Sequence, residues 1–141
     1  VPEMYPGAPA VVAAHLRRGD FVVYLTGRPY MVRPETIAWL KRKGFPEAPL
    51  VTSESLSDML PRENGVERFK LNVLESFRDG SGLRWVAAYG NATTDICAYA
   101  RAGIDVTKTF IIGPHAGKAC AGFAPSQAMT SYTDHLRNWP L

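Results

Sequence analysis

Cysteine, long apolar runs and basic clusters are scarce in this sequence, and each scarcity excludes a class of protein. The two cysteines, Cys97 and Cys120, do not form a CxxC pair, so we expect reduced thiols rather than a disulfide framework. No apolar stretch reaches the roughly 18 residues that a transmembrane helix needs. No basic run alternates with aromatic residues, which argues against a nucleic-acid partner. The first twenty residues lack the charged-then-apolar plan of a signal peptide, so we expect a cytoplasmic protein.

What the sequence does contain is the composition of an ordinary globular domain. Hydrophobic residues make up 46% of the chain and charged residues 21%. The 141 residues suffice for a core of useful size, so we expect residues 1–141 to form a single domain. The net charge of +3 tolerates an anionic partner without identifying one.

Helix and strand patterns alternate along the chain, which predicts an α/β fold with a parallel, three-layer sheet. Apolar spacing, Pro starts and Gly stops predict helices over residues 8–18, 33–44, 66–77, 93–103 and 126–138. Short apolar runs predict strands over residues 21–25, 49–53, 83–89 and 109–113, and breakers predict a loop over residues 54–65. In the second helix we expect Ile37, Leu40 and Trp39 to face inward. Because the alternation opens on a helix, we also expect a leading strand upstream of Val1.

Ligands in open α/β sheets bind at the carboxyl ends of the strands, and three residues with suitable chemistry follow the first strand. Thr26 offers a hydroxyl, Gly27 permits close approach of a ligand, and Arg28 supplies a cation. These residues fit an anion site and an ordinary strand-ending turn equally well.

A second group of polar residues follows a later strand. Asn91 and Asp95 are oxygen donors suited to Mg²⁺, although Asp95 is also explained by capping of a helix in which Thr93 or Thr94 is the N-cap. Lys70 lies at the start of a helix, where it would neutralise a phosphate or remain an ordinary surface lysine.

The order of these residues resembles a known superfamily. Thr26, Lys70 and the Gly90-Asn91-x-x-x-Asp95 segment resemble motifs II, III and IV of the haloacid-dehalogenase-like (HAD) hydrolases. The segments "YLTGRPYMVRPETIAWLKRKGFP", "RFKLNVLESF" and "AAYGNATTDICAYARAGI" resemble its lipin-type branch. That branch comprises the lipin phosphatidate phosphatases and the C-terminal domain of membrane-associated phosphatidylinositol-transfer proteins of the RdgB/Nir group.

The resemblance implies a Rossmann-like HAD core and a role for each residue. Thr26, with Gly27 and Arg28, would bind the substrate phosphate, Lys70 would act as the catalytic lysine, and Asp95 with Asn91 would bind Mg²⁺. Such enzymes carry an Asp nucleophile in a DxDxT motif at the end of their first strand. No DxD occurs in these 141 residues, so either that motif lies upstream of Val1 or the chain derives from a member whose first motif is degenerate, and we expect no hydrolysis by this chain alone.

Three hypotheses follow from the resemblance. The leading one is a Mg²⁺-dependent phosphatase domain acting on a phosphomonoester such as phosphatidic acid. The first alternative is a non-catalytic module that binds phosphatidic acid or another anionic lipid, with Lys41, Arg42 and Lys43 favouring peripheral membrane contact. The second alternative is a soluble HAD phosphatase for small phosphate esters.

Overall fold

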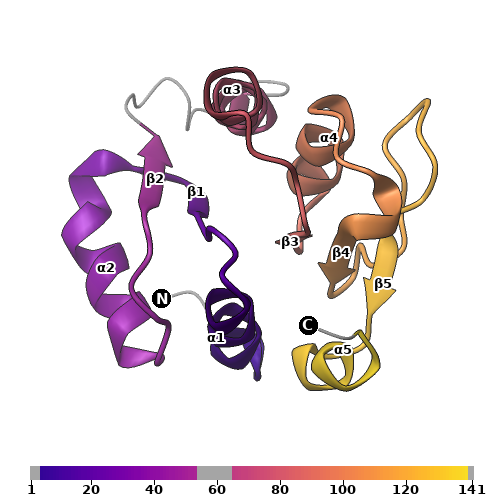
Figure 1. Ribbon diagram of the computed structural model, residues 1–141. Coiled ribbons are helices and arrows are strands. Elements are labelled where there is room, and N and C mark those ends of the chain that lie inside the picture. Colours follow the sequence, from indigo (N-terminus) through magenta and orange to yellow (C-terminus); the bar gives the residue numbers. More distant parts are fainter. Residues whose placement is uncertain (1–3, 54–64, 140–141) are drawn as a thin grey trace. The chain divides into compact units, whose positions relative to one another are not determined.

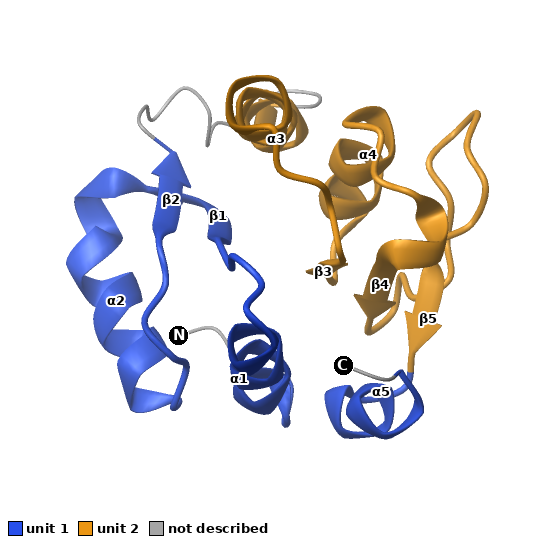
Figure 2. Cartoon of the chain, viewed as in Figure 1, with its two compact units in different colours: residues 1–55, 130–141 blue, residues 56–129 orange. Residues whose placement is uncertain are grey.

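The computed structural model describes residues 4–53 and 65–139 (Figure 1). The chain divides into two compact units, which Figure 2 shows in different colours: unit 1 holds residues 1–55 and 130–141, and unit 2 holds residues 56–129. Each unit has its own parallel sheet, in agreement with the α/β class, while the single domain stays a prediction. The predicted loop at 54–65 lies outside the described residues, apart from Gly65, which begins a helix. Among the described residues, no helix combines the length and apolar character that a membrane span requires.

Unit 1 combines a two-stranded sheet with three α-helices. Its elements are α1 (Ala8–Arg18), β1 (Tyr24–Pro29), η1 (Tyr30–Val32), α2 (Arg33–Arg42), β2 (Leu50–Ser53) and α5 (Tyr132–Asn138). As predicted, α1 ends before Gly19, whose φ of 94° is left-handed and whose N–H bonds the carbonyls of His15 and Leu16. α1 packs against α5 within this unit.

β1 pairs in parallel with β2, but it begins later than predicted and is irregular. The N–H of Tyr24 donates to the carbonyl of Pro49 at 2.9 Å and opens the ladder, whereas Phe21 is exposed. An apolar run alone does not say where a strand finds its partner, so the predicted start at Phe21 was wrong. From Leu25 to Pro29, β1 advances four residues while β2 advances two, from Val51 to Ser53. Residues 26–28 therefore form a bulged stretch inside β1.

α2 has Pro34 in its first turn, as predicted, but its buried face differs from the predicted one. Thr36 is buried and donates its hydroxyl to the carbonyl of Val32 at 3.1 Å, while Ile37 is exposed. Trp39 is half-buried and stacks on Phe45 with ring centroids 5.9 Å apart. The prediction for Ile37 was therefore wrong, and the neighbouring Thr36 is buried instead, with its hydroxyl satisfied by the backbone of its own helix.

Unit 2 is built around a three-stranded parallel sheet in the order β3-β4-β5. Its elements are α3 (Gly65–Ser81), β3 (Ala88–Gly90), α4 (Thr93–Arg101), η3 (Val106–Lys108), β4 (Thr109–Ile112) and β5 (Gln127–Met129). Every residue of the central strand β4 is buried, as expected for a parallel strand covered on both faces. Ile96 and Ala100 of α4 pack with Ile111 and Cys120 in one core cluster.

Two boundaries differ from the sequence-based predictions. The strand predicted over residues 83–89 is limited to β3, and the helix predicted over residues 126–138 is β5 followed by α5. Ser131 is the N-cap of α5, where its side chain accepts a bond from the N–H of Asp134 at 3.0 Å. β5 forms because it pairs with β4 and buries Met129, and this tertiary pairing overrides the helical pattern.

The expectation of reduced thiols is also wrong. Cys97 and Cys120 form a disulfide with their Cα atoms 5.0 Å apart. The bond joins α4 to the connection between β4 and β5, both of which contribute to the same core cluster. A separation of 23 residues carries no local signal of this proximity.

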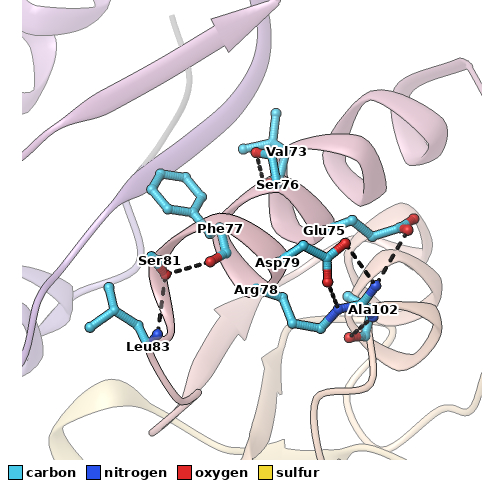
Figure 3. Close-up of polar contacts among 9 residues, drawn as sticks. All are labelled: Val73, Glu75, Ser76, Phe77, Arg78, Asp79, Ser81, Leu83 and Ala102. Carbon is cyan, nitrogen blue, oxygen red and sulfur yellow. Dashed lines mark hydrogen bonds and ion pairs between the residues drawn. The ribbon is translucent and has the colours of Figure 1, made fainter.

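Arg78 joins the C-terminal part of α3 to the end of α4, as Figure 3 shows. Its Nη1 atom donates to the carbonyl of Ala102, the C-cap residue of α4, at 3.0 Å. The guanidinium also lies 2.9 Å from Asp79 Oδ1 and 3.5 Å from Glu75 Oε2. One arginine therefore satisfies a helix-end carbonyl and helps to hold α3 against α4.

Candidate anion-binding site

Lys70 and Asp95 form a buried ion pair in unit 2. Lys70 Nζ lies 2.6 Å from Asp95 Oδ1 and donates a second hydrogen bond to Thr94 Oγ1 at 3.2 Å. Lys70 belongs to α3, Asp95 belongs to the first turn of α4, and the two helices pack against each other. The structure therefore brings together two of the predicted site residues, while their roles in binding stay predictions.

The other carboxylate oxygen of Asp95 accepts bonds from the chain that enters α4. Asp95 Oδ2 accepts from the backbone N–H groups of Asn91 and Ala92, each at 3.1 Å. Ala92 is the N-cap of α4, so neither Thr93 nor Thr94 has the predicted N-cap role. The carboxylate at the third helical position bonds back to the N–H of the N-cap residue, as in one half of a capping box, and the helix dipole favours negative charge there.

Gly90 makes room for this carboxylate. A Cβ atom built on Gly90 would lie 2.6 Å from Asp95 Oδ2 and 2.7 Å from Asp95 Cγ, distances that real Cβ atoms do not tolerate. A glycine at the end of β3 therefore lets the Asp95 side chain lie directly against the backbone. Gly90 belongs to the predicted Gly90-Asn91-x-x-x-Asp95 motif but had no predicted role, and the local signal for one is its place between a strand and the Asn91–Asp95 segment.

Two further residues that connect α3 to α4 were not predicted from the sequence. Thr94 accepts a hydrogen bond from Lys70, and buried Glu67 pairs with Arg101 to connect α3 and α4 a second time. Glu67 lies three residues before Lys70, so both belong to one face of α3. A carboxylate and a lysine at that spacing on an otherwise apolar helix face are the local signal for such partners.

The remaining predicted site residues lie in unit 1, in the bulged stretch of β1. Thr26, Gly27 and Arg28 are half-buried, and Thr26 Oγ1 accepts a bond from the N–H of Arg28 at 3.2 Å. Gly27 is not one of the described glycines with positive φ, so its backbone does not require glycine for that reason. The hydroxyl of Thr26 still has its own proton to donate, which leaves a donor for an anionic ligand.

The predicted magnesium ligands do not make a magnesium site by themselves. Both oxygens of Asp95 are engaged, one by the ammonium of Lys70 and the other by two backbone N–H groups. A divalent cation would compete with the positive charge of Lys70 for the same carboxylate. Within residues 4–53 and 65–139, no group of three or more His, Cys, Asp or Glu side chains is arranged to hold a metal ion. Magnesium binding by Asp95 and Asn91 therefore stays a prediction that needs further ligands.

Comparison with known proteins gives the family. The sequence model described as "PITM 1-3, LNS2 domain" matches residues 1–113. Membrane-associated phosphatidylinositol transfer protein 3 of Mus musculus is 30% identical over 112 residues, which are 79% of this chain and 11% of that protein. Membrane-associated phosphatidylinositol transfer protein 1 of Rattus norvegicus is 31% identical over 112 residues, 79% of this chain and 8% of that protein.

Protein retinal degeneration B of Drosophila melanogaster is 29% identical over 113 residues, again 79% of this chain and 8% of that protein. The chain thus spans about a tenth of the length of the curated relatives it matches. The order of Thr26, Lys70, Asn91 and Asp95 falls inside the matched residues. Since the match to the family model covers residues 1–113 of the 141, this chain belongs to the LNS2-domain family of the PITM 1–3 proteins.

Proposed function

We propose that the chain recognises the phosphomonoester headgroup of an anionic lipid of the phosphatidic acid class. One observation carries this proposal: Lys70 is a buried cation held at the first turn of α4. A lysine ammonium has three N–H donors, and Asp95 and Thr94 engage two of them. The third is available for a phosphate oxygen, and the N-terminal end of α4 adds partial positive charge.

The ion pair of Lys70 and Asp95 also affects which lipid headgroup the chain would prefer. Asp95 neutralises much of the charge of Lys70, so the ligand would be held by directed donors more than by net charge. A phosphomonoester presents three terminal oxygens to such donors, whereas a phosphodiester lipid presents two. This chemistry favours phosphatidic acid over phosphatidylserine. The names of the relatives, phosphatidylinositol transfer proteins, support a lipid as the ligand.

The proposal includes the lipin-like HAD core that the sequence resembles. Its support is the α/β order with parallel sheets and the membership of the LNS2-domain family. Among the described residues, β1 and β3 each pair with one other strand, so each has an edge open to a further strand. A leading strand is part of the same proposal.

Calorimetry with soluble dioctanoyl lipids tests the proposal. We expect dioctanoyl phosphatidic acid to bind and dioctanoyl phosphatidylserine to bind at least about tenfold more weakly, because a charge-assisted hydrogen bond contributes about 1.5–3 kcal/mol. Lys70→Gln should remove that preference, and Lys70→Gln combined with Asp95→Asn should remove it without leaving a buried carboxylate unpaired. Lys108→Gln, an exposed lysine of η3, is the control. Equal binding of both lipids, or unchanged binding by the folded double variant, would contradict the proposal.

The proposed phosphate contacts of Thr26, Gly27 and Arg28 have their own test. Thr26→Val keeps the shape of the side chain and removes the hydroxyl, and we expect it to weaken phosphatidic acid binding. Unchanged affinity in a variant that keeps the wild-type circular dichroism spectrum would contradict a phosphate contact of Thr26.

Phosphomonoester hydrolysis is the second candidate, favoured by the order of Lys70, Asn91 and Asp95 and by the exposed carboxamide of Asn91 at the end of β3. Hydrolysis requires the two carboxylates of a DxDxT motif, which these 141 residues do not contain. It also requires Mg²⁺ as a cofactor. The test is phosphate release by a chain that carries this motif, with Mg²⁺ and either phosphatidic acid or a sugar phosphate. Release that is undiminished in Lys70→Ala and Asp95→Ala would contradict it.

A further inference from the structure

The exposed surface formed by η1 and α2 in unit 1 has a composition unlike that of the rest of the chain. Residues 28–43 contain five basic residues and one acidic residue, a net charge of +4, while the whole chain has a net charge of +3. The other residues therefore sum to −1. Of the basic residues, Lys41, Arg42 and Lys43 are exposed, while Arg28 of β1 and Arg33 are half-buried and Arg33 donates to the carbonyl of Leu50; the acidic residue is Glu35. All the net positive charge of the chain is concentrated on this segment.

Large apolar side chains are exposed in the same segment. Tyr30, Met31 and Ile37 are 57%, 52% and 46% exposed. Such side chains are ordinary when single, but three within eight residues form a local apolar surface. Tyr30 has the amphipathic ring that is typical of the boundary between lipid and water.

The apolar and basic residues share one face of α2. Pro34, Ile37 and Lys41 follow one another at helical spacing and are all exposed, as is Arg42 beside them. This face is apolar over its first turns and basic in its last turn. Its inner face holds Thr36, which is buried. The exposed face of α2 is therefore amphipathic, with Tyr30 and Met31 of η1 before its start and Lys43 at its C-cap.

The charges on this surface are available to a partner. No carboxylate of residues 4–53 and 65–139 forms an ion pair with Lys41, Arg42 or Lys43. A protein partner would have to supply several carboxylates at matching positions, and a nucleic acid would leave the three apolar side chains in water. A bilayer with anionic lipids supplies both a negative surface and an apolar layer beneath it.

We propose that the η1–α2 surface docks the chain on an anionic membrane, with Tyr30, Met31 and Ile37 inserted among the lipids and Lys41, Arg42 and Lys43 against their headgroups. The surface uses residues of unit 1 and does not depend on the proposed headgroup contact of Lys70. It binds negative lipids as a class, whereas the Lys70 contact selects a phosphomonoester.

Co-sedimentation with vesicles tests this proposal. The chain should bind vesicles of phosphatidylcholine with about 30% phosphatidylserine, bind pure phosphatidylcholine vesicles weakly, and lose affinity as salt rises from about 0.1 M to 1 M. Replacing Lys41, Arg42 and Lys43 by Gln should weaken binding about tenfold or more. Replacing Tyr30, Met31 and Ile37 by Ser should weaken it by a similar factor.

Two matched variants serve as controls. Arg17, Arg84 and Lys108 are exposed basic residues outside the surface, and their replacement by Gln removes the same charge. Leu83 and Phe123 are exposed apolar residues of unit 2, and their replacement by Ser removes apolar surface elsewhere. Both controls should bind vesicles within about twofold of the wild type.

Several outcomes would overturn the proposal. These are equal losses in the charge variants on and off the surface, unchanged binding in the Tyr30/Met31/Ile37 variant, or equal affinity for vesicles with and without phosphatidylserine. Failure of the headgroup proposal is detected in a separate experiment, the calorimetry of soluble dioctanoyl phosphatidic acid with the wild type and with Lys70→Gln. The surface variants should bind that soluble lipid like the wild type.

Discussion

Lys70 Nζ of α3 lies 2.6 Å from Asp95 Oδ1 of α4. The two side chains are only 10% and 11% exposed, so this ion pair between the helices is largely shielded from water. Taking either charge out of water is costly, and each ion offsets the cost for the other only while both are present. Two backbone N–H groups complete the carboxylate's hydrogen bonding. The pair is therefore more sensitive to loss of one partner than to loss of both.

The first prediction follows from this asymmetry. Lys70→Met should lower the free energy of unfolding by about 3 kcal/mol, because it leaves a buried carboxylate without its counter-ion. The double variant Lys70→Met with Asp95→Asn should lose less than the sum of the single losses. Urea denaturation of the four proteins measures this coupling, and additive losses would contradict it. Arg137→Gln, which removes an exposed ion pair with Asp134, should cost less than about 1 kcal/mol.

The second prediction concerns the glycine beside the carboxylate. Gly90→Ala should destabilise the protein by at least about 2 kcal/mol, because its Cβ would lie 2.6 Å from Asp95 Oδ2. Gly80→Ala in α3 is the matched control, since a Cβ there meets no atom within 4 Å and the helix gains from alanine. Thermal unfolding should show a melting temperature below that of the wild type for Gly90→Ala and above it for Gly80→Ala. Equal melting temperatures would show that Asp95 does not lie against Gly90.

Local signals explain which parts of the fold could be predicted. α1 and α4 have the predicted starts because local signals lie in their first turns, Pro9 in α1 and Asp95 in α4. β5 could not be predicted, because it exists only through pairing with β4. The disulfide of Cys97 and Cys120 depends on the same tertiary packing.

In the candidate site, too, some features could be predicted from the sequence and others depend on tertiary packing. The order of Lys70 and Asp95 along the chain pointed to one site, and the two side chains do meet although 25 residues separate them. The availability of Asp95 could not be predicted, because it depends on which donors surround the carboxylate. The two N–H groups and the ammonium that occupy its oxygens become visible only in three dimensions. The contact between Lys70 and Asp95 agrees with the predicted grouping, while the roles of both residues in binding stay predictions.

The third prediction concerns the disulfide. Replacing Cys97 and Cys120 by Ala should lower the free energy of unfolding by about 3 kcal/mol, because the bond closes a loop with a sequence separation of 23 residues. Adding dithiothreitol to the wild type should produce a similar loss, and it should leave the double variant unchanged. Thermal unfolding with and without the reductant measures both effects. Rapid reaction of two thiols with a maleimide in the untreated, folded chain would contradict the bond.

The fourth prediction uses the histidines that face Trp139 from α1 and α5. The His135 ring stacks on Trp139 with centroids 5.1 Å apart, and the His15 ring lies 5.8 Å from the same indole. Burial, with a smaller contribution from His15, lowers the pKa of His135 from 6.5 to about 4. His15 Nδ1 in turn lies 2.9 Å from Asp20 Oδ2, which Arg18 also contacts.

Because the folded state disfavours the protonated form of His135, its contribution to stability is complete above pH 6.5 and is lost as the pH falls towards about 4. After allowance for solvent screening, we expect this loss to be about 2 kcal/mol. His135→Gln should flatten this part of the pH profile, while His115→Gln in the connection after β4 should leave it unchanged. Comparing each variant with the wild type by urea denaturation removes the contribution of carboxylates that titrate in the same range. An NMR titration of His135 with a midpoint near 6.5 would contradict the prediction, because a solvated imidazole would bind its proton equally well in both states.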